Sequence, residues 1–286
     1  MLEKGFKMEK SAERLEIIKR MEDSELKGIF DQDVENDPPE LELFPDQVDY
    51  LHKKLKTKIL TYLTLKAGGK FLNSQIQSGN LIIKDIVGVE NLPSKKQGAI
   101  VTCNHFNPLD NFLVLKGLIP SLKKGRFWKV IREGNYTNPP KGFEMFMRYG
   151  DTLPISRNRK TMHNLMIAID KYLKRGDKVL VYPEKALWWN YRKPRPFKTG
   201  AFKFAVTSGV PIIPMFITME DTDKIGVDGF PIQAHTVHIG ECLWPDDNLS
   251  PKENINMLCE KNHQFCVDTY EKFYNTKLKF NTKEGK

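Results

Sequence analysis

The sequence has few of the residues that build metal centres and disulfide frameworks, and it has no long apolar run. Only 4 cysteines and 6 histidines occur in 286 residues. Cysteines 103, 242, 259 and 266 show neither paired metal spacing nor a disulfide framework. We therefore expect no metal site and a reducing, cytoplasmic setting. No apolar run approaches the roughly 18 residues of a membrane-spanning helix, and residues 1–10 lack the apolar core of a signal peptide.

The charges are unevenly divided along the chain. Residues 1–50 contain 7 Lys and Arg against 15 Asp and Glu, a net charge of −8, although the whole chain has a net charge of +9. The remainder is therefore strongly basic, at +17. A basic body is typical of proteins that bind phosphates, acidic membrane surfaces or nucleic acid, and charge alone does not choose among them. We hypothesise that the acidic residues 1–50 cover this basic surface.

The amino-terminal part of the chain is predicted to be helical on both sides of an acidic segment. The apolar spacing predicts a helix over residues 10–28, and the prolines of Asp31–Asp46 indicate a linker or a loosely held strap. A second helix is predicted over Asp46–Ala67, ended by two glycines, with a shorter segment over Phe71–Ile76. We assign residues 1–45 to an acidic helix and linker and 46–79 to a basic amphipathic segment.

The second predicted helix is both apolar and basic. Its broad apolar side carries Val48, Leu51, Leu55, Ile59, Tyr62, Leu63 and Leu65. Its other side carries Lys53, Lys54, Lys56, Lys58 and Lys66. Two interpretations stay open: the helix lies on an anionic membrane, or it packs on the domain with its lysines in solvent.

Strand and helix patterns alternate from Leu81 onward, which is typical of α/β layers with helices covering a sheet. Strands are predicted over 81–83, 99–101, 128–131, 153–155, 178–182 and 210–218. Helices are predicted over 108–118, 140–149, 160–175 and 200–208, and a last helix over about 251–275. We assign residues 80–245 to one α/β domain and 246–286 to a carboxy-terminal helix.

The segment from Asn104 to Asp110 is the most informative motif of the chain. Asn107 is a candidate helix N-cap, Pro108 suits the first helical position, and Asp110 then falls in the first turn. His105 precedes this helix and can meet the Asp110 carboxylate. A carboxylate on one ring nitrogen leaves the other nitrogen free to accept a proton, so the pair is a candidate general base. The spacing is equally compatible with an ordinary helix start.

Three later segments fall at strand ends or strand-to-helix loops, where α/β proteins place their chemistry. Arg157 comes just after an extended stretch, and arginine suits bidentate capture of phosphate. Glu184 follows a buried strand and could bond an acceptor hydroxyl or tie down a loop. The basic run 192–200, interleaved with aromatic residues, suits a membrane interface or nucleic acid. The last segment, Val210–Pro214, is predicted to shape a wall.

Five motifs in a fixed order give the chain a family resemblance over roughly residues 80–245. They are Asn-His-x-x-x-x-Asp, Gly-x-x-x-x-Ile-x-Arg, Tyr-Pro-Glu, the segment Pro196–Phe202, and the segment Gly209–Pro214. In this order they resemble the motifs of the glycerolipid (PlsC-type) acyltransferase superfamily, which includes lysophosphatidic acid acyltransferases. The resemblance implies a mixed, mostly parallel central sheet flanked by helices.

The resemblance also implies roles for individual residues. His105 matches the general base of the family, Asp110 its orienting partner, and Arg157 an arginine that binds the acceptor's phosphate. Glu184 matches the glutamate of the third motif, which usually reads Phe-Pro-Glu-Gly-Thr-Arg. Here it reads Tyr-Pro-Glu-Lys-Ala-Leu, so the usual arginine is absent, and Lys185, Arg192 or Lys193 is left to supply the charge. A lone ammonium does not reproduce a guanidinium fork, so this departure concerns the identity of the acceptor and not the reaction.

The implied reaction moves a fatty acyl chain from an acyl-CoA or acyl-ACP thioester to a lysophospholipid hydroxyl, with no cofactor. Cys103 is expected to be a packed core thiol, and backbone N–H groups near Pro108 are expected to hold the oxyanion. The basic helix and the Trp188/Trp189 region are expected to dock the chain peripherally on the cytosolic face of an anionic membrane. The alternatives are a different lipid acceptor or a non-catalytic lipid-binding protein. We expect no nucleic-acid partner, because no recognition module is present.

Overall fold

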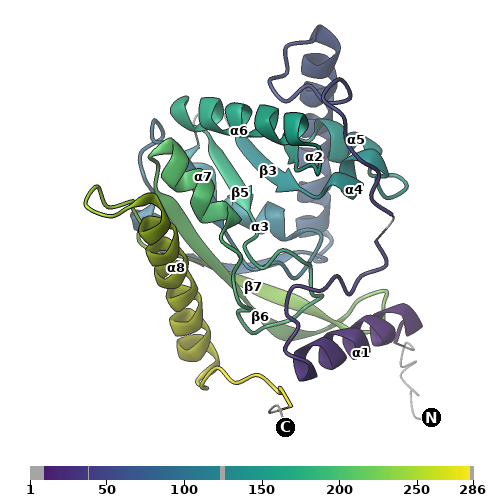
Figure 1. The fold of residues 1–286 in the computed structure, drawn as a ribbon. Helices are drawn as coiled ribbons and strands as arrows, with labels where there is room; N and C mark the ends of the chain where they lie inside the picture. Colours follow the sequence, from purple (N-terminus) through teal and green to yellow (C-terminus); the bar gives the residue numbers. More distant parts are fainter. Residues whose placement is uncertain (1–9, 38, 123–125, 284–286) are drawn as a thin grey trace, which may run out of the picture.

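A seven-stranded sheet forms the centre of the structure, a computed structural model that describes residues 10–37, 39–122 and 126–283 (Figure 1). The strand order is β1-β7-β6-β2-β5-β3-β4. Strands β6 and β7 pair antiparallel, while the other neighbouring pairs are parallel. This confirms the expected α/β fold with a mixed, mostly parallel sheet. The strands are β1 (Ile82–Val87), β2 (Ala99–Thr102), β3 (Phe127–Ile131), β4 (Thr152–Pro154), β5 (Lys178–Val181), β6 (Ile212–Ile225) and β7 (Pro231–Ile239).

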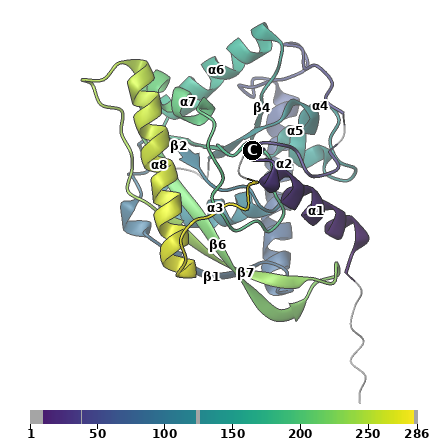
Figure 2. The same ribbon diagram turned by 60° about the horizontal axis from the view of Figure 1, so that its bottom comes forward.

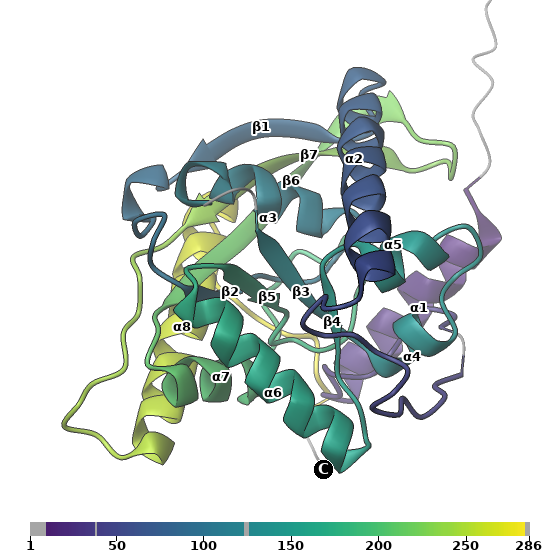
Figure 3. The ribbon, with the colours of Figure 1, turned by 90° about the horizontal axis from the view of Figure 1, so that it is seen from above.

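Helices cover both faces of this sheet (Figure 3). They are α1 (Ala12–Leu26), α2 (Leu55–Gln77), α3 (Asp110–Leu118), α4 (Glu133–Thr137), α5 (Glu144–Tyr149), α6 (Arg159–Lys174), α7 (Gly200–Ser208) and α8 (Pro251–Tyr274), with 3-10 turns at Val89–Asn91 and Ile119–Ser121. The core under α6, α7 and α8 contains Ile100 of β2, and the core under α2 and α3 contains Val101. Successive residues of β2 therefore fill opposite cores, which explains its continuous apolar sequence.

Parallel pairing brings the carboxyl ends of β2, β5, β3 and β4 to one edge of the sheet. The segments that follow these strands therefore meet there, whatever their separation along the chain. His105 follows β2, Tyr182 follows β5, Arg132 follows β3, and Arg157 follows β4. The fold thus gathers His105 and Arg157, which the sequence singles out, with Tyr182 and Arg132 at the edge where α/β proteins bind ligands.

Helix α2 differs from its prediction in both bounds and orientation. It begins at Leu55, because the Asp49 carboxylate accepts hydrogen bonds from the N–H groups of Lys53 and Lys54 before it. It then continues through Gly68 and Gly69 to Gln77, where the sequence predicted a break. Gly68 lies against the Phe146 ring of α5, and a Cβ at this position would be at an ordinary contact distance of 3.4 Å from the ring.

The buried face of α2 is made of three small residues and one leucine, and not of the apolar residues predicted to share one side. Thr61, Thr64, Gly68 and Leu72 are buried. The apolar side chains predicted to form one face are instead exposed, at 71% for Leu55, 50% for Ile59, 65% for Tyr62, 50% for Leu63 and 40% for Leu65. The helix packs on the domain and leaves an apolar and basic surface uncovered. Among the residues described above, no helix is long and apolar enough to span a bilayer.

The acidic segment between α1 and α2 is a firmly held strap and not a loose linker. Val34 and Leu43 are each 1% exposed. The N–H of Leu43 donates to Glu133 Oε1 at 2.7 Å, and its carbonyl accepts from the hydroxyls of Ser156 and Thr161, both at 2.9 Å. These contacts fix the strap across the segments that follow β3 and β4.

The carboxy-terminal end of the described chain lies beside the last turn of α1 (Figure 2). Beyond α8 the chain turns back, and the N–H of Asn281 donates to Glu25 Oε1 at 2.8 Å. The N–H of Lys283 donates to the carbonyl of Leu26 at 2.9 Å. The carboxy-terminal segment therefore holds α1 in place against the rest of the domain.

Candidate active site

The loop from Cys103 to Leu109 joins β2 to α3 and carries the candidate base. Helix α3 begins at Asp110 and not at Pro108. The side chain of Asn107 accepts from the N–H of Leu109 at 2.9 Å, and its carbonyl accepts from the N–H of Asp110 at 3.0 Å. Asn107 therefore forms a turn before the helix and is not its cap.

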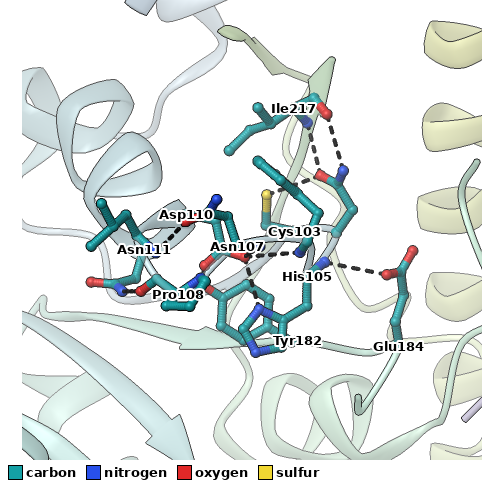
Figure 4. Close-up of polar contacts among 12 residues, drawn as sticks. Cys103, His105, Asn107, Pro108, Asp110, Asn111, Tyr182, Glu184 and Ile217 are labelled. Carbon is teal, nitrogen blue, oxygen red and sulfur yellow. Dashed lines mark hydrogen bonds and ion pairs between the residues drawn. The ribbon is translucent and has the colours of Figure 1, made fainter. Parts of the chain in front are cut away.

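His105 and Asp110 are in direct contact (Figure 4). His105 Nδ1 lies 2.8 Å from Asp110 Oδ2, which also accepts from the N–H groups of Phe106 and Asn107 at 3.1 and 3.2 Å. A carboxylate oxygen can only accept hydrogen bonds, so His105 Nδ1 donates its proton to Asp110 Oδ2. His105 Nε2 then keeps its lone pair. The Asp110 side chain is 1% exposed and that of His105 is 22% exposed. The arrangement can accept a proton from a hydroxyl at Nε2.

Four N–H groups around Pro108 have acceptors within the loop and the start of α3. Those of Phe106 and Asn107 bond Asp110, that of Leu109 bonds Asn107, and that of Asp110 bonds the carbonyl of Asn107. The expectation that backbone N–H groups near Pro108 hold an oxyanion is therefore wrong for these four groups, since each already has an acceptor.

The end of β2 is pinned to β6 by an amide that the sequence analysis did not single out. Asn104 Nδ2 donates to the carbonyl of Ile217 at 3.0 Å, and its Oδ1 accepts from the N–H of Ile217 at 2.8 Å. Cys103 beside it is 0% exposed, and burial raises the pKa of its thiol well above its usual value. Cys103 is thus a packed core thiol, as expected. Among the residues that the structure describes, no three His, Cys, Asp or Glu side chains gather as metal ligands.

Glu184 binds the backbone of the loop that carries the candidate base His105. Its carboxylate accepts from the N–H of His105 at 3.2 Å, from the N–H of Arg195 at 2.9 Å and from Arg195 Nη2 at 2.7 Å. Glu184 is 2% exposed and Arg195 is 1% exposed. This geometry corresponds to the loop-tying alternative for Glu184, because its oxygens face protein donors and not an open site.

Arg195 is the site residue that sequence reasoning missed. Its guanidinium also donates to the carbonyls of His105, Ala186 and Phe30. It lies 4.7 Å from the ring of Trp188, within the range of a cation–π contact. In the sequence, Arg195 differs from the other basic residues of its run by standing between two prolines, Pro194 and Pro196. The run as a whole is typical of an exposed surface.

The basic run is neutralised and its tryptophans are buried, contrary to the membrane-docking prediction for this region. Trp188 is 0% and Trp189 is 7% exposed, since both pack against α1 and the strap. Arg192 Nη2 donates to Asp221 at 2.7 Å, and the predicted anion-binding role of this side chain would require that pair to open. Further along the run, Lys193 pairs with Glu25 at 2.6 Å and Lys198 pairs with Asp31 at 2.9 Å.

Lys185 occupies a backbone conformation that favours glycine. Its φ is +72°, in the left-handed region, and its side chain is exposed. The family pattern places glycine at this position, and the backbone here keeps the turn that glycine would suit. Lys185 therefore presents an ammonium from the turn directly after Glu184. This is compatible with its predicted role as a replacement for the missing arginine of the third motif.

Two arginines at the carboxyl edge contact acidic residues of the strap. Arg157 Nε donates to Glu133 Oε2 at 3.2 Å, and its Nη2 lies 3.9 Å from Glu40. Arg132, which the sequence analysis did not mention, bonds Asp37 at 2.5 Å and Glu40 at 3.1 Å. The acidic segment thus lies on basic residues of the body, as we hypothesised. β4, which leads to Arg157, lies three strand positions from β2, which leads to His105. The two strands are therefore roughly 14 Å apart across the sheet.

Comparison with known proteins gives a consistent set of relatives. A family model described as Acyltransferase matches residues 85–218. The chain is 32% identical over 143 residues to a chloroplastic 1-acyl-sn-glycerol-3-phosphate acyltransferase of Brassica napus, a match that covers 49% of this chain and 38% of that protein. It is 26% identical over 179 residues to a 1-acyl-sn-glycerol-3-phosphate acyltransferase of Chlamydomonas reinhardtii, covering 63% of this chain and 50% of that protein.

A solved structure is also similar. It is the 1-acyl-sn-glycerophosphate acyltransferase PlsC from Thermotoga maritima, with 21% sequence identity and a TM-score of 0.49, over 80% of this chain and 87% of that chain. The matches to the two curated relatives span 38% and 50% of their lengths. The chain therefore spans half or less of the curated relatives it matches.

Proposed function

The chain belongs to the glycerolipid (PlsC-type) acyltransferase superfamily through its residues 85–218, and on that premise we propose that it is a lysophospholipid O-acyltransferase. It transfers a fatty acyl chain from an acyl-CoA or acyl-ACP thioester to a lysophospholipid hydroxyl. The preferred acceptor is 1-acylglycerol-3-phosphate, which gives phosphatidic acid. The observation that carries this proposal is the contact of His105 Nδ1 with the buried Asp110 carboxylate, which leaves Nε2 on a partly exposed ring.

In the proposed mechanism the acceptor supplies the nucleophile. His105 Nε2 removes the proton of the acceptor hydroxyl as its oxygen attacks the thioester carbonyl. The intermediate collapses with cleavage of the C–S bond, and the imidazolium returns the proton to the leaving thiolate. Asp110 holds the ring and stabilises the imidazolium without taking its proton. No covalent enzyme intermediate is required, which agrees with the buried, protonated thiol of Cys103.

The acceptor profile tests this proposal. Transfer from a long-chain acyl-CoA and from an acyl-ACP would be measured with lysophosphatidic acid, zwitterionic lysolipids and monoacylglycerol. We expect transfer to lysophosphatidic acid to be fastest. A zwitterionic or uncharged preference would favour the different-acceptor alternative, which the altered third motif supports. A folded protein that acylates none of them with either donor would favour the non-catalytic lipid-binding alternative.

Arg157 is proposed to bind the phosphate of the acceptor, in exchange for its contact with Glu40. Its side chain is 67% exposed and lies at the same sheet edge as His105. Replacing Arg157 with alanine is expected to raise KM for lysophosphatidic acid about 10- to 100-fold, since a hydrogen bond to a charged group is worth about 1.5–3 kcal/mol. KM for monoacylglycerol, which has no phosphate, should change little.

The control for this prediction lies two residues away. Arg159 is also exposed and begins α6. Arg159→Ala is expected to leave KM for both acceptors unchanged. If Arg157→Ala raised KM equally for the two acceptors, or for neither, phosphate recognition by Arg157 would be refuted.

The exposed surface of α2 is proposed to dock the protein peripherally on the cytosolic face of an anionic membrane. Leu55 and Ile59 offer apolar contact, and the exposed Lys56 and Lys58 offer positive charge beside them. Replacing both lysines with glutamine is expected to weaken binding to anionic vesicles roughly 30-fold, at about 1 kcal/mol for each charge. Co-sedimentation with vesicles of phosphatidylglycerol and phosphatidylcholine measures this change.

The matched control replaces two exposed lysines on the opposite side of the sheet. Lys160 and Lys171 lie on α6, which packs on the other core. The Lys160→Gln/Lys171→Gln variant is expected to bind vesicles like the parent protein. Equal losses in the two double variants would mean that net charge, and not the surface of α2, drives membrane binding.

A further inference from the structure

Tyr182 lies against both members of the His105–Asp110 pair (Figure 4). It follows β5, whose last residue Val181 pairs with Thr102 at the end of β2. Its ring stacks on the imidazole of His105, with ring centroids 3.9 Å apart and planes inclined by 12°. Its hydroxyl donates a hydrogen bond to Asp110 Oδ1 at 2.5 Å. The ring of Tyr182 thus contacts the proposed base His105, and its hydroxyl contacts the orienting carboxylate of Asp110.

The two oxygens of Asp110 have separate partners. Oδ2 accepts from His105 Nδ1 and from two backbone N–H groups, whereas Oδ1 accepts from Tyr182. The hydroxyl therefore keeps the carboxylate from rotating Oδ1 toward the imidazole. It also draws negative charge toward Oδ1 and away from Nδ1. The usual phenylalanine of the third motif could supply the stacking ring but not this hydrogen bond.

We infer that Tyr182 is a positioning residue that acts on His105 through Asp110, an inference that rests on the proposed function for its catalytic consequence. The ring fixes the plane of the imidazole. The hydroxyl fixes the carboxylate and limits how strongly it favours the imidazolium over the neutral base. His105 is thereby kept in an orientation that presents Nε2 to the acceptor hydroxyl.

The hydroxyl is suited to act as a permanent donor. Burial, together with the Asp110 carboxylate, raises the pKa of Tyr182 well above its ordinary value, so the phenol stays neutral. The other ionisable groups around the pair are Cys103 at the end of β2, Glu184 and Arg195 behind the loop, and His235 of β7. Burial raises the pKa of Cys103 and lowers that of His235, so both are uncharged at neutral pH. Glu184 and Arg195 neutralise one another.

The test is Tyr182→Phe, which keeps the stacked ring and removes only the hydroxyl. The titration of the His105 ring would be followed by NMR, with its signal assigned by comparison with His105→Ala. Loss of the hydroxyl should make Asp110 a stronger partner for the imidazolium, so the midpoint should rise by roughly half a pH unit. The lower limb of the kcat/KM–pH profile should move in the same direction, and kcat at neutral pH should fall about tenfold through looser positioning.

The control is Tyr172→Phe, which also removes a buried, hydrogen-bonded hydroxyl. Tyr172 stacks on Trp128 and donates to the carbonyl of Tyr50, in the core under α6. This variant is expected to lose stability without shifting the His105 midpoint. An unchanged midpoint in Tyr182→Phe would overturn the inference even if the protein is an active acyltransferase. A shifted midpoint in a protein that acylates no acceptor would support the contact while refuting the proposed function.

Discussion

Replacing His105 with alanine is expected to lower the rate of acyl transfer by at least ~10²–10⁴-fold, the usual contribution of a general base. The imidazole is the group whose Nε2 can reach an acceptor hydroxyl, while Asp110 behind it is 1% exposed. The fold should survive, because the contacts that hold the loop use the backbone of His105 and not its ring. Its N–H bonds Glu184, and its carbonyl accepts from Trp188 and Arg195. Initial rates with a long-chain acyl-CoA and thermal unfolding would be measured on the same preparations.

His163 provides the control for this substitution. It is exposed on α6 and belongs to none of the candidate motifs. His163→Ala is expected to keep the full rate of transfer. If His105→Ala stayed folded and equally active, the protein would use another base or none, and the roles given to Asp110 and Tyr182 would fall with it.

Replacing Arg195 with alanine is expected to lower the free energy of unfolding by about 3–5 kcal/mol, the usual cost of removing one partner of a buried ion pair. Both Arg195 and Glu184 are nearly inaccessible to solvent, so Glu184 would be left as an uncompensated buried charge. The carbonyls of Phe30, His105 and Ala186 would also lose a donor. Chemical denaturation followed by far-ultraviolet circular dichroism measures the change.

A neighbouring ion pair supplies the comparison. Arg192 lies three residues earlier and pairs with Asp221, but its side chain is 39% exposed and that of Asp221 is 59% exposed. Arg192→Ala is therefore expected to cost only about 0–1 kcal/mol. A loss for Arg195→Ala as small as that for Arg192→Ala would contradict the view that the buried pair holds the base loop in place.

The contact between His105 and Asp110 could be predicted from the sequence because both residues lie on one short loop and its helix start. Cap and turn preferences act over a few residues, so local chemistry brings the pair together. The same holds for the sheet: strands such as β2 and β5 are short apolar runs between turn residues, and their alternation with helices predicts their layers. Even here the helix started two residues later than Pro108, because Asn107 closes a turn of its own.

The partners of the pair could not be predicted, because they come from strands that only the sheet order places together. Tyr182 reaches Asp110 because β5 pairs with β2, and the sequence separation of 72 residues holds no hint of that contact. Arg195 reached Glu184 from within a basic run that suggested an exposed surface. Charge density in a sequence does not reveal which cation is buried, since that depends on the acids that fold over it.

The amphipathic pattern of α2 was also insufficient to orient the helix. Apolar periodicity predicts that Leu55, Leu63 and Leu65 face the core, whereas all three are exposed. The helix instead buries Thr61, Thr64, Gly68 and Leu72. Small residues make close helix contacts that a hydrophobic pattern overlooks. The exposed leucines are therefore a reason to expect a further partner surface, for which we propose the membrane.

The most direct test of the account is to identify the product formed from lysophosphatidic acid and a long-chain acyl-CoA or acyl-ACP by mass spectrometry. We predict that the parent protein and His163→Ala form phosphatidic acid, whereas folded His105→Ala forms at most a trace. The account would be contradicted if His105→Ala formed as much phosphatidic acid as the parent protein. It would also be contradicted if none of the three folded proteins formed phosphatidic acid with either donor.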